Sequence, residues 1–256
     1  MSNNKFIVKD FPIDKKIVAD IAAFNKYVNL MHGLFQVDIS HIRQQIKIAK
    51  REQNLNISIL ACLLYCFAQA LDKHKAAFAM VGKGNKYYQF EEADVFFPFE
   101  LQQDGDKIIW YKIIRRVNKK SILELEEDLK KMLQMKKTFT KVERLFMQFP
   151  GFLRRLFYRR TMRNPLIRKD YVGNVYFSST IHSGNTRVIS YGLPTHFHSV
   201  GMFIGTFMDV KNIEPQKPNA NIIGATLSLD HLISDGPMLA RLIREFVFQV
   251  ENFKLL

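Results

Sequence analysis

The sequence has little cysteine. Its 256 residues contain only Cys62 and Cys66, four positions apart. Two thiols cannot build the disulfide framework of a small secreted domain, and a metal site would need further ligands that the neighbouring sequence does not supply. We therefore predict two reduced, buried thiols on one face of a helix, as expected in a reducing compartment.

The sequence also lacks an apolar run long enough to cross a membrane. The longest one, around 57–71, is interrupted by Ser58 and Gln69 and is shorter than the roughly 20 residues that a bilayer requires. The start, MSNNKFIVKDF, has neither the basic nor the apolar region of a secretory signal. These absences predict a cytoplasmic protein in which residues 55–74 form a buried helix.

No linker rich in proline, glycine or serine divides the chain. With 47% hydrophobic and 24% charged residues, a chain of this length can bury a substantial core. We therefore expect one domain over residues 1–256.

Acidic residues are scarce in one segment of an already basic chain. The formal net charge is +14, and residues 136–169 contain the single acid Glu143. The eleven basic residues of this segment are Lys136, Lys137, Lys141, Arg144, Arg154, Arg155, Arg159, Arg160, Arg163, Arg168 and Lys169. The excess positive charge is therefore concentrated in one segment, and we expect a basic helical insert at about 136–170.

Within this insert, VERLFMQF and FLRRLFYRR interleave aromatic residues with arginines. Three interpretations fit this pattern. A solvated helical hairpin could pack its Phe and Leu side chains onto the sheet, a basic amphipathic helix could lie on a membrane surface, or the charge could bind nucleic acid. We favour the packed hairpin, disfavour membrane contact, and expect no nucleic acid.

Hydrophobic periodicity and turn residues divide the chain into helices and strands. Helices are expected at 14–28, from 38 or 40, at 55–74, at 121–135 and from 237 to about 253; strands are expected at 33–37, 76–81, 86–101, 106–117, 173–180, 185–192, 199–210 and 220–231. GKGN at 82–85 is predicted to be a hairpin turn, and Ser121 with Glu124 forms a capping box. Strands clustered between helices indicate an α/β or α+β sandwich.

The stretch LSLDHLISDG, residues 227–236, carries the candidate site. Alternation along the strand places Leu227, Leu229 and His231 on one face, so His231 is expected to be sheltered at the end of a buried row. Asp235 precedes Gly236 and a proline, which is the arrangement of a helix N-cap. These residues alone favour a structural histidine over a catalytic one.

DHLISDG resembles the H-x-x-x-D-G signature of the coenzyme A-dependent acyltransferases, which include chloramphenicol acetyltransferase and the catalytic core of the 2-oxo acid dehydrogenase dihydrolipoyl acyltransferases. Asp-His at its start is the dihydrolipoyl form. VGNVYFSS is similar to the family's glycine-led strand, and the order of elements follows the same core over nearly the whole chain. The resemblance implies a chloramphenicol acetyltransferase-like α/β fold, a two-layer sandwich with a mixed sheet packed against helices.

The resemblance further implies a homotrimer in which acyl-coenzyme A, the substrate, occupies a tunnel between subunits. His231 would be the general base for a thiol or hydroxyl acceptor, a task suited to a side chain that titrates near neutral pH. Ser178 would donate a hydrogen bond to the tetrahedral oxyanion. Asp235, followed by Gly236, would fix the histidine loop.

The sequence departs from the family in two places. An arginine of the N-terminal helix is expected to hold the residue at Asp235, but this chain offers Lys15 or Lys16, which lack the two-pronged guanidinium; we take Lys16. The chain carries no lipoyl group, so a dihydrolipoyl acceptor would come from another protein. A catalytically silent trimeric scaffold of the same fold is the alternative.

The remaining histidines give little support to a metal. His182, His196 and His198 include a His-x-His pattern, but no carboxylate accompanies them in sequence. We therefore predict no metal site.

Overall fold

A computed structural model describes residues 20, 29–82, 84, 86–103, 106–135, 141–181, 187–194, 196–210 and 219–255. The helix predicted over 14–28 lies outside these residues except for Asp20, which is helical. Within the described part of the chain, no helix has the length and apolar character needed to cross a membrane.

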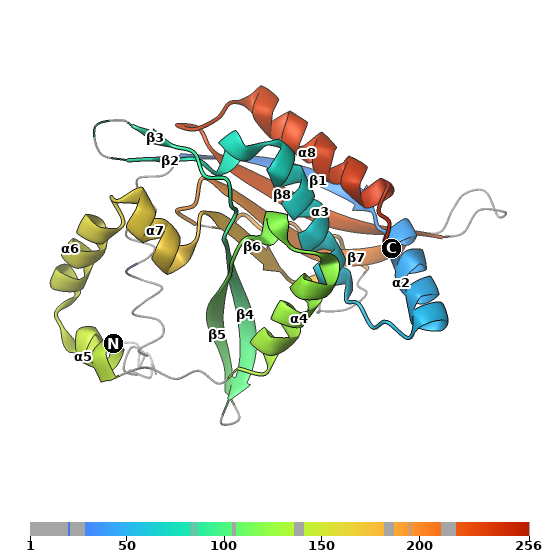
Figure 1. Ribbon diagram of the computed structural model, residues 1–256, viewed down its shortest axis with the longest axis horizontal. Coiled ribbons are helices and arrows are strands. Elements are labelled where there is room, and N and C mark those ends of the chain that lie inside the picture. The colour runs from blue at the N-terminus through green and yellow to red at the C-terminus, as the bar shows by residue number, and fades with distance from the viewer. Residues whose placement is uncertain are drawn as a thin grey trace, which may run out of the picture.

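A six-stranded mixed sheet forms one layer (Figure 1). Its order is β1-β8-β7-β6-β4-β5; β6 is parallel to both of its neighbours, and the other pairs are antiparallel. The strands are β1 (Leu30–Asp38), β4 (Val95–Gln103), β5 (Asp106–Ile114), β6 (Val175–Ser179), β7 (Val200–Val210) and β8 (Ala220–Asp230). A separate antiparallel pair, β2 (Met80–Val81) and β3 (Tyr87–Tyr88), forms the predicted hairpin around residues 82–85.

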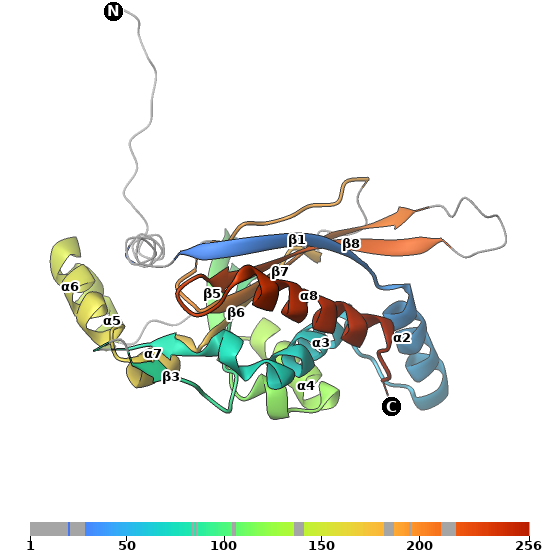
Figure 2. The same ribbon diagram turned by 90° about the horizontal axis from the view of Figure 1, so that it is seen from above.

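Four helices form the second layer on one face of the sheet (Figure 2). They are α2 (Ser40–Gln53), α3 (Ile59–Lys73), α4 (Ile122–Leu133) and α8 (Gly236–Glu251). The mixed sheet and its helices confirm the predicted α/β sandwich. Three further helices occupy the range of the basic insert: α5 (Lys141–Gln148), α6 (Gly151–Thr161) and α7 (Pro165–Val172).

Alternation along the central strands explains the two layers. In β8, Ile223, Ala225, Leu227 and Leu229 belong to the hydrophobic core beneath α3 and α8. Thr226 and Ser228 point to the opposite face and are nevertheless fully buried. The side of the sheet away from the four helices is therefore covered as well, which matters because it carries Ser178.

The buried helix α3 forms where the sequence predicts it. Ser58 caps it by accepting a hydrogen bond from the amide of Ala61 at 3.1 Å. Cys62 and Cys66 are buried free thiols, and burial raises the pKa of the Cys62 thiol to about 12. Both cysteines therefore stay protonated near neutral pH and act as small apolar side chains.

Three strand predictions were wrong in part. Residues 187–192, from the predicted strand at 185–192, are not in a strand. In the 76–81 segment a 3-10 helix (Lys75–Phe78) comes first and only two residues pair. The predicted strand at 86–101 is split into β3 and β4, because residues 89–94 are not in a strand. There the amide of Ala93 donates to Asn118 Oδ1 at 2.8 Å, a contact between residues 25 positions apart.

Candidate functional site

His231 stands at the first position after β8. Its amide donates to the carbonyl of Asn29 at 2.8 Å, which ties the start of the loop to the segment entering β1. The strand ends at Asp230, so the alternation does not extend to the histidine, and the His231 side chain is exposed in the single chain. The prediction that it is sheltered at the end of the buried row was wrong; its imidazole is accessible.

Asp235 caps α8 as the sequence predicts. Its Oδ1 accepts from the amide of Met238 at 2.9 Å, and its carbonyl accepts from Leu239 at 3.1 Å. Pro237 lies in the first turn, where its missing amide costs nothing. A side chain at Gly236 would meet no atom within 4 Å, so the space there does not require glycine. Lys15 and Lys16 lie outside the described residues.

A tyrosine that the sequence did not single out holds the middle of the histidine loop. The Tyr87 hydroxyl lies 2.9 Å from the carbonyl oxygens of both Leu232 and Ile233, to which it donates. The contact joins residues 145 positions apart, and no local pattern indicates it. Hydrogen bonds therefore hold the loop at the backbone of His231, at Leu232 and Ile233, and at the start of α8.

Ser178 lies on β6, on the sheet face away from the helical layer. It pairs in register with Phe203, which pairs with Thr226 of β8. Thr226 therefore lies two strands away from Ser178, and Asp230 is four residues further along β8. From the usual spacing between strands and rise per residue, Ser178 is on the order of 17 Å from Asp230. One chain therefore does not bring Ser178 and His231 together.

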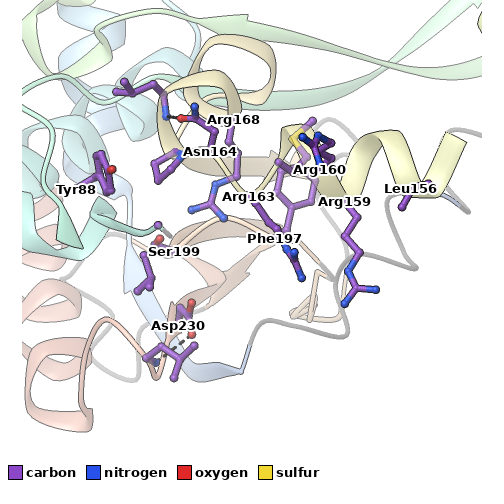
Figure 3. Close-up of a pocket in the computed structure, with 16 residues that line it drawn as sticks. Tyr88, Leu156, Arg159, Arg160, Arg163, Asn164, Arg168, Phe197, Ser199 and Asp230 are labelled. Atoms are coloured by element: carbon purple, nitrogen blue, oxygen red, sulfur yellow. Dashed lines mark hydrogen bonds between the residues drawn. The ribbon is translucent and has the colours of Figure 1, made fainter. Parts of the chain in front are cut away.

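A hollow of about 970 Å³ opens beside the histidine loop (Figure 3). Asp230 and Leu232, the neighbours of His231, form part of its wall, and four arginines of α6, α7 and their connection contribute much of the rest. The residues around it are Val81, Gly82, Tyr88, Leu156, Arg159, Arg160, Met162, Arg163, Asn164, Pro165, Leu166, Arg168, Phe197, Ser199, Asp230 and Leu232. Apolar walls with several cations suit an anionic ligand that also has apolar parts.

Two opposite charges face this hollow. Burial lowers the pKa of Arg168 to about 10, while the charge of Asp230 opposes the shift. Burial also raises the pKa of Asp230. The hydrogen bond from the amide of Leu232 and the positive charge of Arg168 lower this pKa, but they offset the effect of burial only in part. The Arg168 guanidinium remains protonated near neutral pH and its Nε donates to the Met80 sulfur at 3.0 Å.

His196 and His198 are buried behind the sheet face that carries Ser178. His196 stacks on Tyr176 with ring centroids 4.8 Å apart, and it lies against Gly201, where a Cβ would come within 2.3 Å of its Nε2. His182 lies outside the described residues. In the described part of the chain no three His, Cys, Asp or Glu side chains are grouped to hold a metal.

His198 makes the protein sensitive to mild acid. Its Nε2 donates to the Val172 carbonyl at 2.8 Å, and burial lowers its pKa to about 3. An unfolded histidine titrates near 6.5, so between about pH 6.5 and 3 the unfolded state binds the extra proton. We expect the free energy of unfolding to fall with pH in this window by up to about 1.4 kcal/mol per unit for this side chain, as measured by urea unfolding at pH 7 and pH 5.

The matched variant is His198→Gln, whose amide nitrogen can replace Nε2 at the Val172 carbonyl without taking up a proton. Its stability should fall less steeply between the two pH values than that of the unchanged protein. Equal slopes would show that His198 does not carry this dependence.

Comparisons with known proteins identify the fold. No protein-family model matches the chain, and no curated protein matches it significantly. A solved structure of a probable dihydrolipoamide acetyltransferase from Listeria monocytogenes has a TM-score of 0.69 and 15% identity, over 99% of this chain and 97% of the other. A chloramphenicol acetyltransferase has a TM-score of 0.55 and 10% identity, over 96% and 99%.

A third similar structure is the dihydrolipoamide acetyltransferase of Azotobacter vinelandii, with a TM-score of 0.66 and 15% identity over 96% of this chain and 92% of the other. It was solved to investigate one serine, one histidine and one asparagine in the catalytic mechanism. There the serine precedes the histidine by 52 residues, and the asparagine follows the histidine by four. The chain thus has the chloramphenicol acetyltransferase-like fold that the sequence predicted.

Proposed function

We propose that this protein is an acyltransferase that moves an acyl group between coenzyme A and a thiol or hydroxyl acceptor. The observation that carries the proposal is the histidine loop: an accessible imidazole, on a backbone held by three sets of contacts, beside a cationic hollow in an acyltransferase-like fold.

The spacing of three residues supports the same roles. Ser178 precedes His231 by 53 residues and Asp235 follows it by four, against 52 and four in the Azotobacter enzyme. By this spacing Asp235 would correspond to that asparagine, and both residue types are good N-caps. Ser179 has the matching separation of 52, but alternation along β6 places it on the same face as Val175 and Phe177, which belong to the core under the helices. Ser178 is on the opposite face, and we take it as the candidate.

In the proposed reaction, the neutral His231 imidazole removes the proton from the acceptor S–H or O–H group as that atom attacks the thioester carbonyl. The new bond to carbon forms, and the carbonyl oxygen becomes an oxyanion to which the Ser178 hydroxyl donates. The carbon–sulfur bond to coenzyme A then breaks. The imidazolium returns its proton to the departing thiolate, which restores the base.

The separation within one chain requires two subunits. Because Ser178 lies on the order of 17 Å from Asp230, the residue before His231, Ser178 and His231 can both act on one carbonyl only if they come from different copies. This fits the homotrimer that the family resemblance implies, with His231 of one subunit facing Ser178 of its neighbour. A dihydrolipoyl acceptor would be carried by a separate protein.

The hollow offers a place for the anionic end of the donor. Arg168 lines it, and a guanidinium group binds phosphate through two parallel hydrogen bonds. Its apolar walls, such as Phe197 and Tyr88, suit a base or a pantetheine chain. The hollow would thus orient coenzyme A beside His231.

Calorimetric titration with coenzyme A and acetyl-coenzyme A tests the site without a known acceptor. The proposal expects saturable binding with one site per chain and a dissociation constant in the micromolar range. The absence of binding up to millimolar ligand would favour the silent trimeric scaffold over the enzyme.

The change Ser178→Ala is expected to lower kcat by about 100-fold or more, because it removes a hydrogen bond that strengthens as the oxyanion forms. The measurement is chromatographic quantification of the coenzyme A and S-acetyl-dihydrolipoamide formed from acetyl-coenzyme A and dihydrolipoamide, because the total number of thiols does not change in this transfer. Ser179→Ala is the matched control and should keep most of its turnover. A larger loss of kcat in the Ser179 variant would show that Ser179, and not Ser178, is the oxyanion donor.

A further inference from the structure

Helices α5 and α6 present an unusually apolar surface to solvent. They lie at one edge of the molecule, away from α2 and α8 (Figures 1 and 2). We call their outward side the α5–α6 face. Its large exposed apolar residues are Leu145, Phe149, Phe152, Leu153, Leu156 and Phe157. Single exposed apolar side chains are ordinary, but six within thirteen residues mark a binding surface.

Helix α6 buries a charged residue and exposes its apolar side, which is the reverse of a normal surface helix. Its one buried residue is Arg154, 7% exposed, whereas Phe152 is 68% and Leu156 is 62% exposed. Arg154 Nε donates to Asp20 at 2.8 Å, and one of its Nη atoms donates to the Phe149 carbonyl at 2.6 Å. A buried, paired arginine thus fixes the helix with its apolar side outward. The favoured sequence interpretation, that these Phe and Leu side chains pack onto the sheet, was wrong.

Positive charge surrounds the apolar side chains. Arg155, Arg159 and Arg160 are exposed on α6, and Arg163 follows it. Helix α6 contains no Asp, Glu, Asn or Gln, so this helix offers no acid or amide group to fix the register of a protein partner; on α5 the exposed amide is that of Gln148. A second copy of this face would bring like charges together. An apolar band flanked by arginines is instead the pattern of a helix that lies in a lipid headgroup region.

We propose that the α5–α6 face docks onto the surface of an anionic lipid bilayer. Phe152, Leu153 and Leu156 enter the boundary between headgroups and acyl chains, and Arg160 and Arg163 bind lipid phosphates. Leu156 and Arg160 also line the hollow beside the histidine loop. Docking would therefore place the mouth of that hollow next to the membrane surface. The inference does not depend on acyl transfer.

Sedimentation of the full chain with vesicles tests this docking. The probes are vesicles of phosphatidylcholine alone and of phosphatidylcholine mixed with phosphatidylglycerol. Binding is expected to the mixed vesicles and to weaken with salt. The double variant Phe152→Ser/Leu156→Ser should lower the partition coefficient by at least about tenfold. Because both side chains are exposed, thermal unfolding should change little, and this is measured in parallel.

A charge-matched pair separates the face from the general basicity of the chain. Arg160→Glu/Arg163→Glu should weaken binding by at least about 30-fold, from roughly 1 kcal/mol for each basic side chain near the membrane surface. Arg241→Glu/Arg244→Glu changes exposed arginines of α8 by the same total charge and should have a much smaller effect.

Equal weakening by the two arginine pairs, or undiminished binding of Phe152→Ser/Leu156→Ser, would overturn the proposal, because adsorption would then be a property of net charge. No binding to either vesicle would also overturn it and leave an acidic protein as the occupant of this face.

Discussion

Replacement of His231 by alanine should lower kcat by about 100- to 10,000-fold, the usual contribution of a general base. The acceptor must lose its proton as it attacks, and His231 is the only histidine in the stretch 227–236. Because the His231 imidazole is exposed, its removal should leave the free energy of unfolding almost unchanged. The measurement is chromatographic quantification of the coenzyme A formed from acetyl-coenzyme A and dihydrolipoamide, alongside urea unfolding.

A matched histidine provides the control. His41 lies on α2 in the helical layer, away from the histidine loop, and its Nε2 donates to the carbonyl of Phe253 at 2.8 Å. The variant His41→Ala should therefore keep the kcat of the unchanged protein. A His231→Ala protein within a few-fold of the original kcat would refute the assigned role. Coenzyme A binding that persists in this variant would show that the lost step is chemical.

Locally encoded features were predictable from the sequence. Ser121 and Glu124 form the predicted capping box with reciprocal hydrogen bonds, and Asp235 caps α8. Both depend on residues within four positions of one another, so side-chain chemistry is sufficient to specify them. The alternation of β8 likewise separates its core residues from its polar ones.

Features that depend on distant partners could not be predicted in this way. The exposure of His231 depends on where β8 stops pairing with β1, and the Tyr87 contact depends on a hairpin 145 positions away. In α6, periodicity separates apolar from basic residues but does not state which side faces the protein. That choice is made by Asp20, which pairs with Arg154 from outside the insert.

The separation of Ser178 from His231 is a further example. The motifs indicate their residue types, but only the strand order β8-β7-β6 and its register show that one chain holds them apart. The proposal that the site is shared between subunits came from the family resemblance. The separation of the two residues within the sheet is a geometric argument in its favour.

The change Asp94→Ala should destabilise the fold by about 3–5 kcal/mol, the cost of removing one partner from a buried charge cluster. Asp94 is 2% exposed; its Oδ2 accepts from Lys169 Nζ at 2.6 Å and Arg115 Nη1 at 2.9 Å, and its Oδ1 accepts from the Arg116 amide at 2.9 Å. Burial alone would raise its pKa, but the bonds from Lys169, Arg116 and Arg115 lower it. Urea unfolding measures the loss.

The position of Asp94 predicts where the loss is felt first. Lys169 belongs to α7, so the carboxylate fastens the insert to the start of β4, and the α7 amides should lose hydrogen-exchange protection before those of α3. Glu127→Ala is the control: its ion pair with Lys131 is exposed at the surface, so its loss should change the free energy of unfolding far less than the loss of Asp94. If the two variants were equally stable, the buried cluster would not be what holds α7, and the hollow beside His231 would need another support.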